Sequence, residues 1–169
     1  MLAELVGPAG RLVAIELNSE LAQRARINLA SHSWVEVLQG DGSTIGGPFN
    51  AIFINGGATH PRSEWLDGLA PDGRLVLPLT AYMPGMPFAS GFFVRTRRSR
   101  DAYSFELISP VAMFDCEGAR DEALNAKLVQ LFRQGAWKRI HSLRRDTHAA
   151  EKSCLLHAAH FCFSEANVE

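Results

Sequence analysis

Two acidic residues follow the ends of two short apolar stretches of this 169-residue chain. Glu16 comes directly after residues 12–15, and Asp41 follows residues 35–38 within the sequence GDGS. A carboxylate at the end of a buried parallel strand can accept hydrogen bonds from both hydroxyls of a ribose. An aspartate between glycines can accept one from the exocyclic amine of adenine, because glycine lets the backbone approach a flat ring. The two acids together favour a nucleoside-binding site.

Both acids also have a purely structural interpretation. Glu16 precedes a predicted helix, whose macrodipole favours a nearby negative charge by about 0.3–1 kcal/mol. Asp41 could instead cap a Gly-Asp-Gly turn with its own side chain. Hydrogen bonds to a charged acceptor are worth about 1.5–3 kcal/mol each, but Glu16 taken alone does not decide between the two interpretations. Asp41 favours nucleoside binding, because it follows the next strand and lies between two glycines. The sequence leaves the alternative open for each acid.

The elements that must position these acids alternate between strands and helices. The expected strands are residues 12–15, 35–38, 50–55 and 74–77, and the expected helices are residues 19–30 and 61–69. Residues 12–15 are apolar throughout, as in a strand covered on both faces. Ser19 is the expected cap of the first helix, and Pro61 the expected first residue of the second. Short crossovers of this kind predict a doubly wound α/β sheet.

The second half of the chain is less regular. An antiparallel pair is expected at residues 92–98 and 102–109, a helix at residues 121–133, and one final strand at residues 153–164 with a possible bend at Ala158 and Ala159. The sequence has no internal repeat, linker or low-complexity tract. We therefore expect a single domain over residues 1–169.

The composition excludes several classes of partner. With 17 basic and 18 acidic residues the net charge is −1, which predicts no nucleic-acid partner and no attraction to an anionic membrane. No apolar stretch is long enough to span a bilayer, and the first ten residues lack the pattern of a secretion signal. We expect a cytoplasmic protein. Nothing in the sequence indicates an oligomeric state.

The cysteines and histidines near the end of the chain raise the question of a metal site. Cys154, His157, His160 and Cys162 lie close in sequence, with Cys116 as the third cysteine. In a single strand residues 157 and 160 point to opposite faces, and no acid stands near them. We therefore expect buried thiols and no metal.

His60 has two interpretations, a general base or a residue that precedes a helix.

Four segments of the first half resemble a known family. The sequences LAELVGPAGRLVAIELNSELAQRARINLA, VEVLQGDGS, FNAIFINGGATHP and LAPDGRLVLPL are similar, in order and spacing, to successive motifs of class I S-adenosylmethionine-dependent methyltransferases. The most similar group is the protein-L-isoaspartate O-methyltransferases. The resemblance covers about residues 2–79. It implies S-adenosylmethionine as the cofactor and a protein or peptide carboxylate as a candidate methyl acceptor.

The resemblance also implies roles for individual residues. Glu16 would hold the cofactor ribose, Asp41 and Gly42 would lie beside the adenine, and residues 55–58 would border the methionine end. The implied cofactor-binding set is Glu16, Leu17, Asp41, Gly42, Asn55 and Gly56. No catalytic residue can be carried over.

One part of the family pattern is missing from this sequence. Family members begin the fold with a strand that leads into a Gly-x-Gly-x-Gly turn, and they carry a substrate-binding Ser or Thr in an N-terminal segment; neither precedes Leu2. The missing strand is central, and strands lie about 4.8 Å apart, so its loss separates its neighbours by about 10 Å or forces them together. We therefore expect an α/β, Rossmann-like methyltransferase sheet that lacks its first strand, with an antiparallel C-terminal portion, in an N-terminally truncated chain.

Three functions are compatible with these observations. The first is an S-adenosylmethionine-dependent methyltransferase. The second is a catalytically inactive remnant or assembly subunit that keeps the scaffold without turnover. The third is an NAD-dependent oxidoreductase, which also places an acid on a ribose but gives no role to the GDGS sequence.

Overall fold

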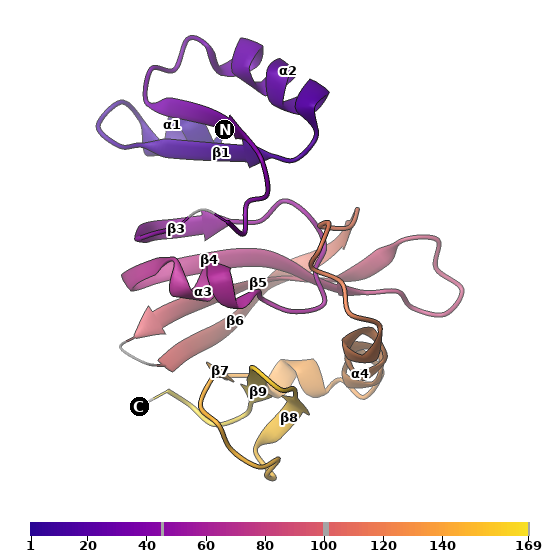
Figure 1. Cartoon of the computed structure of the whole chain (residues 1–169). Coiled ribbons are helices and arrows are strands. Elements are labelled where there is room, and N and C mark those ends of the chain that lie inside the picture. Colours follow the sequence, from indigo (N-terminus) through magenta and orange to yellow (C-terminus); the bar gives the residue numbers. More distant parts are fainter. Residues whose placement is uncertain (45, 100–101, 169) are drawn as a thin grey trace. The chain divides into compact units, whose positions relative to one another are not determined.

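The computed structural model describes residues 1–44, 46–99 and 102–168. The chain forms two compact units, residues 1–45 and residues 46–169 (Figure 1). Each unit is described by itself below.

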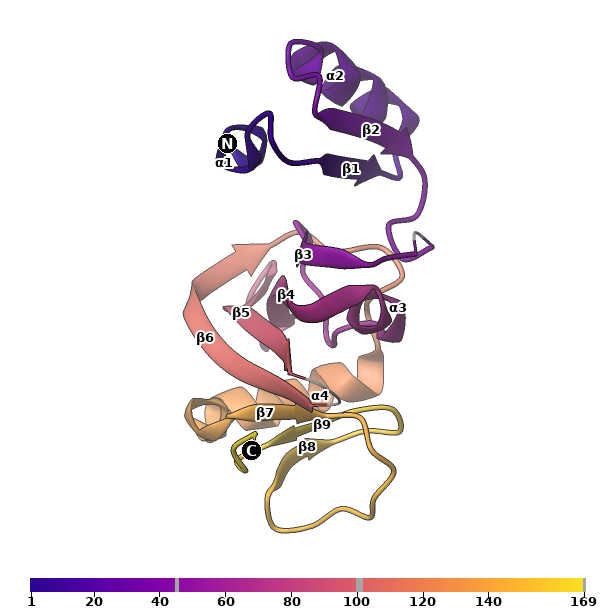
Figure 2. The same cartoon turned by 90° about the vertical axis from the view of Figure 1, so that its left-hand side faces the viewer.

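The first unit is a small parallel βαβ arrangement. It contains α1 (Leu2–Val6), β1 (Leu12–Glu16), α2 (Ser19–Leu29) and β2 (Val35–Gln39). The two strands pair in parallel, with Leu12 opposite Val35 and Glu16 opposite Gln39. Helix α2 runs along this pair, as Figure 2 shows. The strand, helix and strand predicted for this part of the sequence are therefore confirmed.

Two details of the first unit differ from expectation. Asn18, not Ser19, caps α2, because its side chain accepts hydrogen bonds from the backbone N–H groups of Glu20 and Leu21. An extended residue just before the helix directs its oxygen at these free N–H groups, and Asn18 occupies that place. All five residues of β1 are half-buried rather than buried, since a two-stranded sheet with one helix beside it offers little cover.

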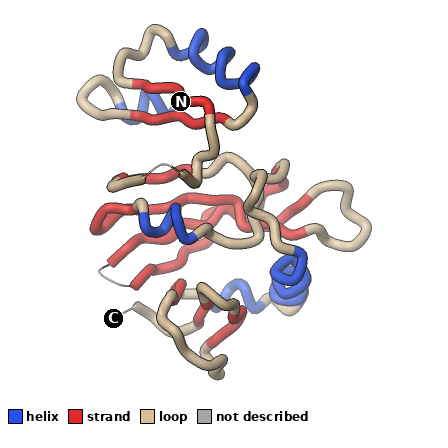
Figure 3. The backbone as a smooth tube through the Cα atoms, viewed as in Figure 1, coloured by secondary structure: helices blue, strands red, loops and turns tan. Residues whose placement is uncertain are grey.

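The second unit contains a seven-stranded sheet (Figure 3). Its elements are β3 (Phe49–Phe53), α3 (Ser63–Asp67), β4 (Leu69–Ala81), β5 (Ala89–Ser99), β6 (Ala102–Met113), α4 (Glu122–Arg133), the 3₁₀ helix η1 (Ala136–Arg139), β7 (Ser142–Arg144), β8 (Cys154–His157) and β9 (Cys162–Ser164). The strand order is β3-β4-β5-β6-β7-β9-β8. Strands β3 and β4 are parallel, and the other neighbouring pairs are antiparallel.

This topology confirms the α/β class and the antiparallel C-terminal portion. Strands β1 and β3 belong to different sheets, and in the described part of the chain each has one strand neighbour.

Other boundaries differ from the predicted ones. Strand β4 is much longer than residues 74–77, because residues 69–73 also belong to it, with an irregularity in the pairing and Asp72 at φ 61°. Helix α3 begins at Ser63, and Pro61 lies before its N-cap, Arg62. Proline fixes φ at a value that extended backbone also uses, so it does not by itself begin a helix.

The end of the chain forms a hairpin instead of one strand. Residues 158–161 turn between β8 and β9, and β9 pairs on its other side with β7, which was not predicted. The core of this unit packs helix α4 against the sheet. Its fully buried large side chains are Leu66, Leu69, Leu75, Leu77, Leu79, Val94, Leu128, Leu143 and Phe163.

Among the described residues, no helix combines the length and the apolar character needed to cross a membrane.

Candidate functional site

Glu16 lies at the carboxyl end of β1, beside the end of β2. Its Oε1 accepts a hydrogen bond from the backbone N–H of Asn18 at 2.9 Å. Its Oε2 has no hydrogen bond to the described residues. The backbone N–H of Gly40 donates to the carbonyl of Glu16 at 3.0 Å, which joins the two strand ends. One carboxylate oxygen therefore fixes the side chain, and the other remains able to accept a ligand hydroxyl.

Asp41 begins a tight turn directly after β2. Its Oδ1 accepts hydrogen bonds from the backbone N–H and the hydroxyl of Ser43, both at 2.8 Å. The Thr44 hydroxyl donates to the carbonyl of Asp41 at 2.8 Å. These bonds form the side-chain turn that the structural interpretation of Asp41 predicted. A side chain at Gly42 would meet Ile15 at an ordinary contact distance of 3.9 Å, so this turn does not by itself require glycine there.

The structure brings part of the predicted set together. The parallel pairing of β1 and β2 places Glu16, the exposed Leu17, Asp41 and Gly42 at the same end of one strand pair. Asn55 and Gly56 belong to the second unit, where they follow β3. The roles of these six residues toward a cofactor stay predictions.

The segment after β3 is held by backbone hydrogen bonds to residues 114–116. The N–H of Gly57 donates to the carbonyl of Phe114 at 2.7 Å, and the N–H of Cys116 donates back to Gly57 at 2.9 Å. A Cβ atom at Gly56 would lie 2.9 Å from the Cα of Cys116, closer than side chains tolerate. Glycine at this position therefore lets two backbone segments approach each other.

Arg120 ties the same region together and was not singled out in the sequence. Its guanidinium donates to Asp115 at 2.8 Å, to the carbonyl of Thr80 at 2.6 Å and to the Thr80 hydroxyl at 2.8 Å. The Tyr82 hydroxyl donates to the other oxygen of Asp115 at 2.9 Å, and this hydrogen bond raises the pKa of Tyr82. These residues come from separate stretches without a shared motif, so no local signal could have grouped them.

His60 lies beside this network, next to Thr59. Its Nδ1 is 3.0 Å from the Thr59 hydroxyl, and its ring stacks on Phe161 with centroids 6.0 Å apart. Burial lowers the pKa of His60, although Asp121 opposes the shift. A histidine kept neutral in this way can accept a proton. The general-base role of His60 stays a prediction.

Known proteins match this chain over a stretch that begins in the first unit and continues into the second. The family model described as protein-L-isoaspartate(D-aspartate) O-methyltransferase matches residues 1–86. The chain is 41% identical over 85 residues to protein-L-isoaspartate O-methyltransferase of Aeropyrum pernix, which covers 47% of this chain and 33% of the relative. It is 37% identical over 82 residues to protein-L-isoaspartate O-methyltransferase 2 of Archaeoglobus fulgidus, which covers 46% of this chain and 37% of the relative.

The structure is also similar to a solved one. A protein-L-isoaspartate O-methyltransferase superposes with a TM-score of 0.58 at 16% identity, over 78% of this chain and 41% of that one. The fold is accordingly that of a Rossmann-like methyltransferase. Because the family model matches just over half of the sequence, the chain belongs to the protein-L-isoaspartate(D-aspartate) O-methyltransferase family. It spans about a third of the length of the curated relatives named above.

Proposed function

We propose that this chain binds S-adenosylmethionine and takes part in methyl transfer to an isoaspartyl carboxylate of a protein or peptide. The observation that carries the proposal is the position of Glu16, fixed by Asn18 at the end of β1 and next to the end of β2. The family membership supports it and favours it over the NAD-dependent alternative.

The proposed chemistry asks for positioning more than for acids and bases. S-adenosylmethionine, when bound, supplies a methyl group activated by the adjacent sulfonium. A carboxylate acceptor is already ionised at neutral pH, so it needs no general base. Alignment of the acceptor with the methyl group then provides most of the rate enhancement. In this proposal Glu16 holds the ribose, and Asp41 and Gly42 border the adenine.

Calorimetric titration with S-adenosylhomocysteine tests the cofactor site. The variant Glu16→Gln keeps an oxygen that can accept the Asn18 N–H but removes the charge. We expect it to weaken binding about 10- to 100-fold, the equivalent of a charge-assisted hydrogen bond. Glu36→Gln is the matched control, because Glu36 lies on β2 in the same unit and pairs with Arg11 on the surface. Equal affinity of both variants and the unaltered chain would refute the role of Glu16.

Methyl transfer to a peptide tests the substrate class. An isoaspartyl peptide and the same peptide with ordinary aspartate are offered with radiolabelled S-adenosylmethionine. We expect base-labile methyl ester to form on the isoaspartyl peptide in preference to the other. Cofactor binding without transfer to either peptide would instead support the non-catalytic alternative.

A further inference from the structure

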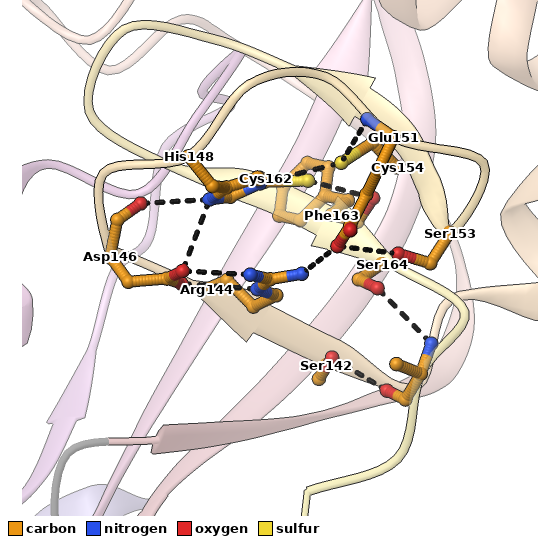
Figure 4. A network of polar contacts seen from close by, with 11 residues as sticks. Ser142, Arg144, Asp146, His148, Glu151, Ser153, Cys154, Cys162, Phe163 and Ser164 are labelled. Atoms are coloured by element: carbon orange, nitrogen blue, oxygen red, sulfur yellow. Dashed lines mark hydrogen bonds and ion pairs between the residues drawn. The ribbon is translucent and has the colours of Figure 1, made fainter.

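Four metal-ligating side chains meet at the C-terminal hairpin. One nitrogen or sulfur atom from each of His148, Cys154, His157 and Cys162 lies within 4.8 Å of every other. Cys162 is buried and the other three are half-buried. Figure 4 shows His148, Cys154 and Cys162 close together beside the ion pairs of Arg144. This cluster takes no part in the proposed methyl transfer.

The hairpin explains why the cluster forms. His157 on β8 and Cys162 on β9 are direct partners in the antiparallel pair, so their side chains lie on one face. The register shifts between Cys154 and Leu156, and such an irregularity changes the direction of a side chain. A regular strand would place residues 154 and 157 on opposite faces. The structure has an irregular hairpin here in place of the single regular strand on which the expectation of no metal depended.

His148 reaches the cluster from the loop between β7 and β8. Arg144 holds this loop through ion pairs with Asp146, at 2.7 Å, and with Glu151. The Nδ1 of His148 lies 2.9 Å from the carbonyl of Asp146 and 3.2 Å from its carboxylate. These acceptors place the ring proton on Nδ1 and leave the Nε2 lone pair for the cluster, where it lies 3.4 Å from the Cys154 sulfur. Histidine ligands of metals are oriented in the same way.

Two further contacts suit a metal site. The backbone N–H of Glu151 donates to the sulfur of Cys154 at 3.5 Å, which favours a thiolate. The Nδ1 of His157 is buried and has no hydrogen-bond partner among the described residues. Coordination through this nitrogen would supply the partner. A buried polar atom without one is uncommon in native proteins and calls for an explanation.

The ligand set selects the kind of metal. Two thiolates and two imidazoles are a common donor set of structural Zn²⁺ sites, and four protein ligands leave no open position for chemistry. With Zn–S about 2.3 Å and Zn–N about 2.0–2.1 Å, ligand atoms of a tetrahedron lie about 3.3–3.8 Å apart. The four ligand atoms, which lie up to 4.8 Å apart, therefore have to approach one another by about 1 Å to coordinate one ion tetrahedrally.

The geometry points to a structural zinc site formed by His148, Cys154, His157 and Cys162. The ion fastens the loop of residues 145–153 to the β8–β9 hairpin. Strands β7, β8 and β9 have only three or four residues each, and such short strands gain most from a link between them.

Metal content of the tag-free chain tests the site. The chain is purified from cells grown in zinc-supplemented medium, and elemental analysis should find one zinc ion per chain. Removal of the zinc with a chelator should lower the Tm, and addition of zinc should restore it. The variants Cys162→Ser and His148→Gln should lose the metal. His160→Gln and Cys116→Ser are matched controls, because they change a neighbouring histidine and the third cysteine outside the cluster, and both should retain it.

A second measurement covers variants that fail to fold. The unaltered chain, loaded with Co²⁺ in place of zinc, should show the thiolate charge-transfer band and the strong visible bands of a tetrahedral ion. A metal-free chain with unchanged Tm on zinc addition would overturn the site. So would zinc retained by both ligand variants, or a disulfide between Cys154 and Cys162 detected by mass spectrometry in the chain as purified under reducing conditions.

Discussion

His157 and Cys162 face each other across the β8–β9 pair, although five positions separate them in sequence. The four-residue turn between them also brings Phe163 into the core, where its ring lies 5.1 Å from that of Phe105 and 5.0 Å from that of Phe161. The hairpin therefore has two sides, one polar with the cysteines and histidines, and one aromatic that packs inward.

Replacing Phe163 with alanine tests the aromatic side. Phe163 is 1% exposed, so the substitution leaves a cavity and should lower the free energy of unfolding by about 3–5 kcal/mol in urea titrations. Phe114→Ala is the matched control, because Phe114 is 91% exposed and its loss should change stability by less than about 0.5 kcal/mol. Similar effects of the two substitutions would contradict the packing described here.

Gly56→Ala tests the close approach of the segment after β3 to Cys116. The added methyl group would lie 2.9 Å from two atoms of Cys116, and overpacking of this kind should cost about 1–3 kcal/mol of unfolding free energy. Gly46→Ala serves as the comparison, since nothing lies within 4 Å of a Cβ atom there. Chemical denaturation measures the free energy of unfolding of both variants. A larger loss of stability in Gly46→Ala than in Gly56→Ala would contradict the close approach to Cys116.

The pH dependence of stability should report on His60. Burial lowers the pKa of His60 in the folded protein, Asp121 and Glu64 oppose this shift, and Arg62 adds to it. The unfolded chain, with a histidine pKa near 6.5, then takes up the proton at a higher pH than the folded chain. The free energy of unfolding should therefore fall as the pH drops through about 6.5, and the loss should level off below the folded pKa.

Thermal unfolding measures the contribution of His60 to this pH dependence. The unaltered chain and His60→Gln are compared between pH 7.5 and 5. The variant should lose less stability over the range than the unaltered chain does. His160→Gln, at an exposed position, should behave as the unaltered chain. An identical pH profile for His60→Gln would rule out a buried neutral imidazole.

Asn18→Ala tests the cap of α2. Its side chain accepts hydrogen bonds from Glu20 at 2.9 Å and Leu21 at 3.0 Å, and loss of such a cap costs about 0.5–2 kcal/mol. Hydrogen exchange of the α2 amides measures the local loss directly. Ser19→Ala, which the sequence pattern made the expected cap, should have a clearly smaller effect.

The sequence predicted elements with strong local signals. Helix α4 is an example, because Leu124, Leu128 and Leu131 repeat at helical spacing and Asp121 caps its first turn. The β1–α2–β2 order, the β5–β6 pair and the end position of Glu16 followed from similar patterns. Each of these depends on residues that are close together in the chain.

Features that depend on distant residues were missed. Arg120 is forty positions from Thr80, and no periodicity relates them. His148 was not connected with Cys154 because its position depends on the loop that Arg144 holds. The sequence pattern places the cap of α2 one residue late, at Ser19, because asparagine and serine are both good caps and only the backbone conformation decides between them.

Strand β3 has a consequence for handling the protein. It hydrogen-bonds to β4 along one edge, and within the described residues no strand pairs with the other. Its sequence, Phe49–Phe53, has no charged residue, and Phe53 is 41% exposed. Natural proteins usually guard such an edge with lysine or proline, since it otherwise serves as a template for intermolecular pairing. Concentrated solutions should therefore scatter light through edge-to-edge association, and a lysine introduced by Ala51→Lys should suppress it.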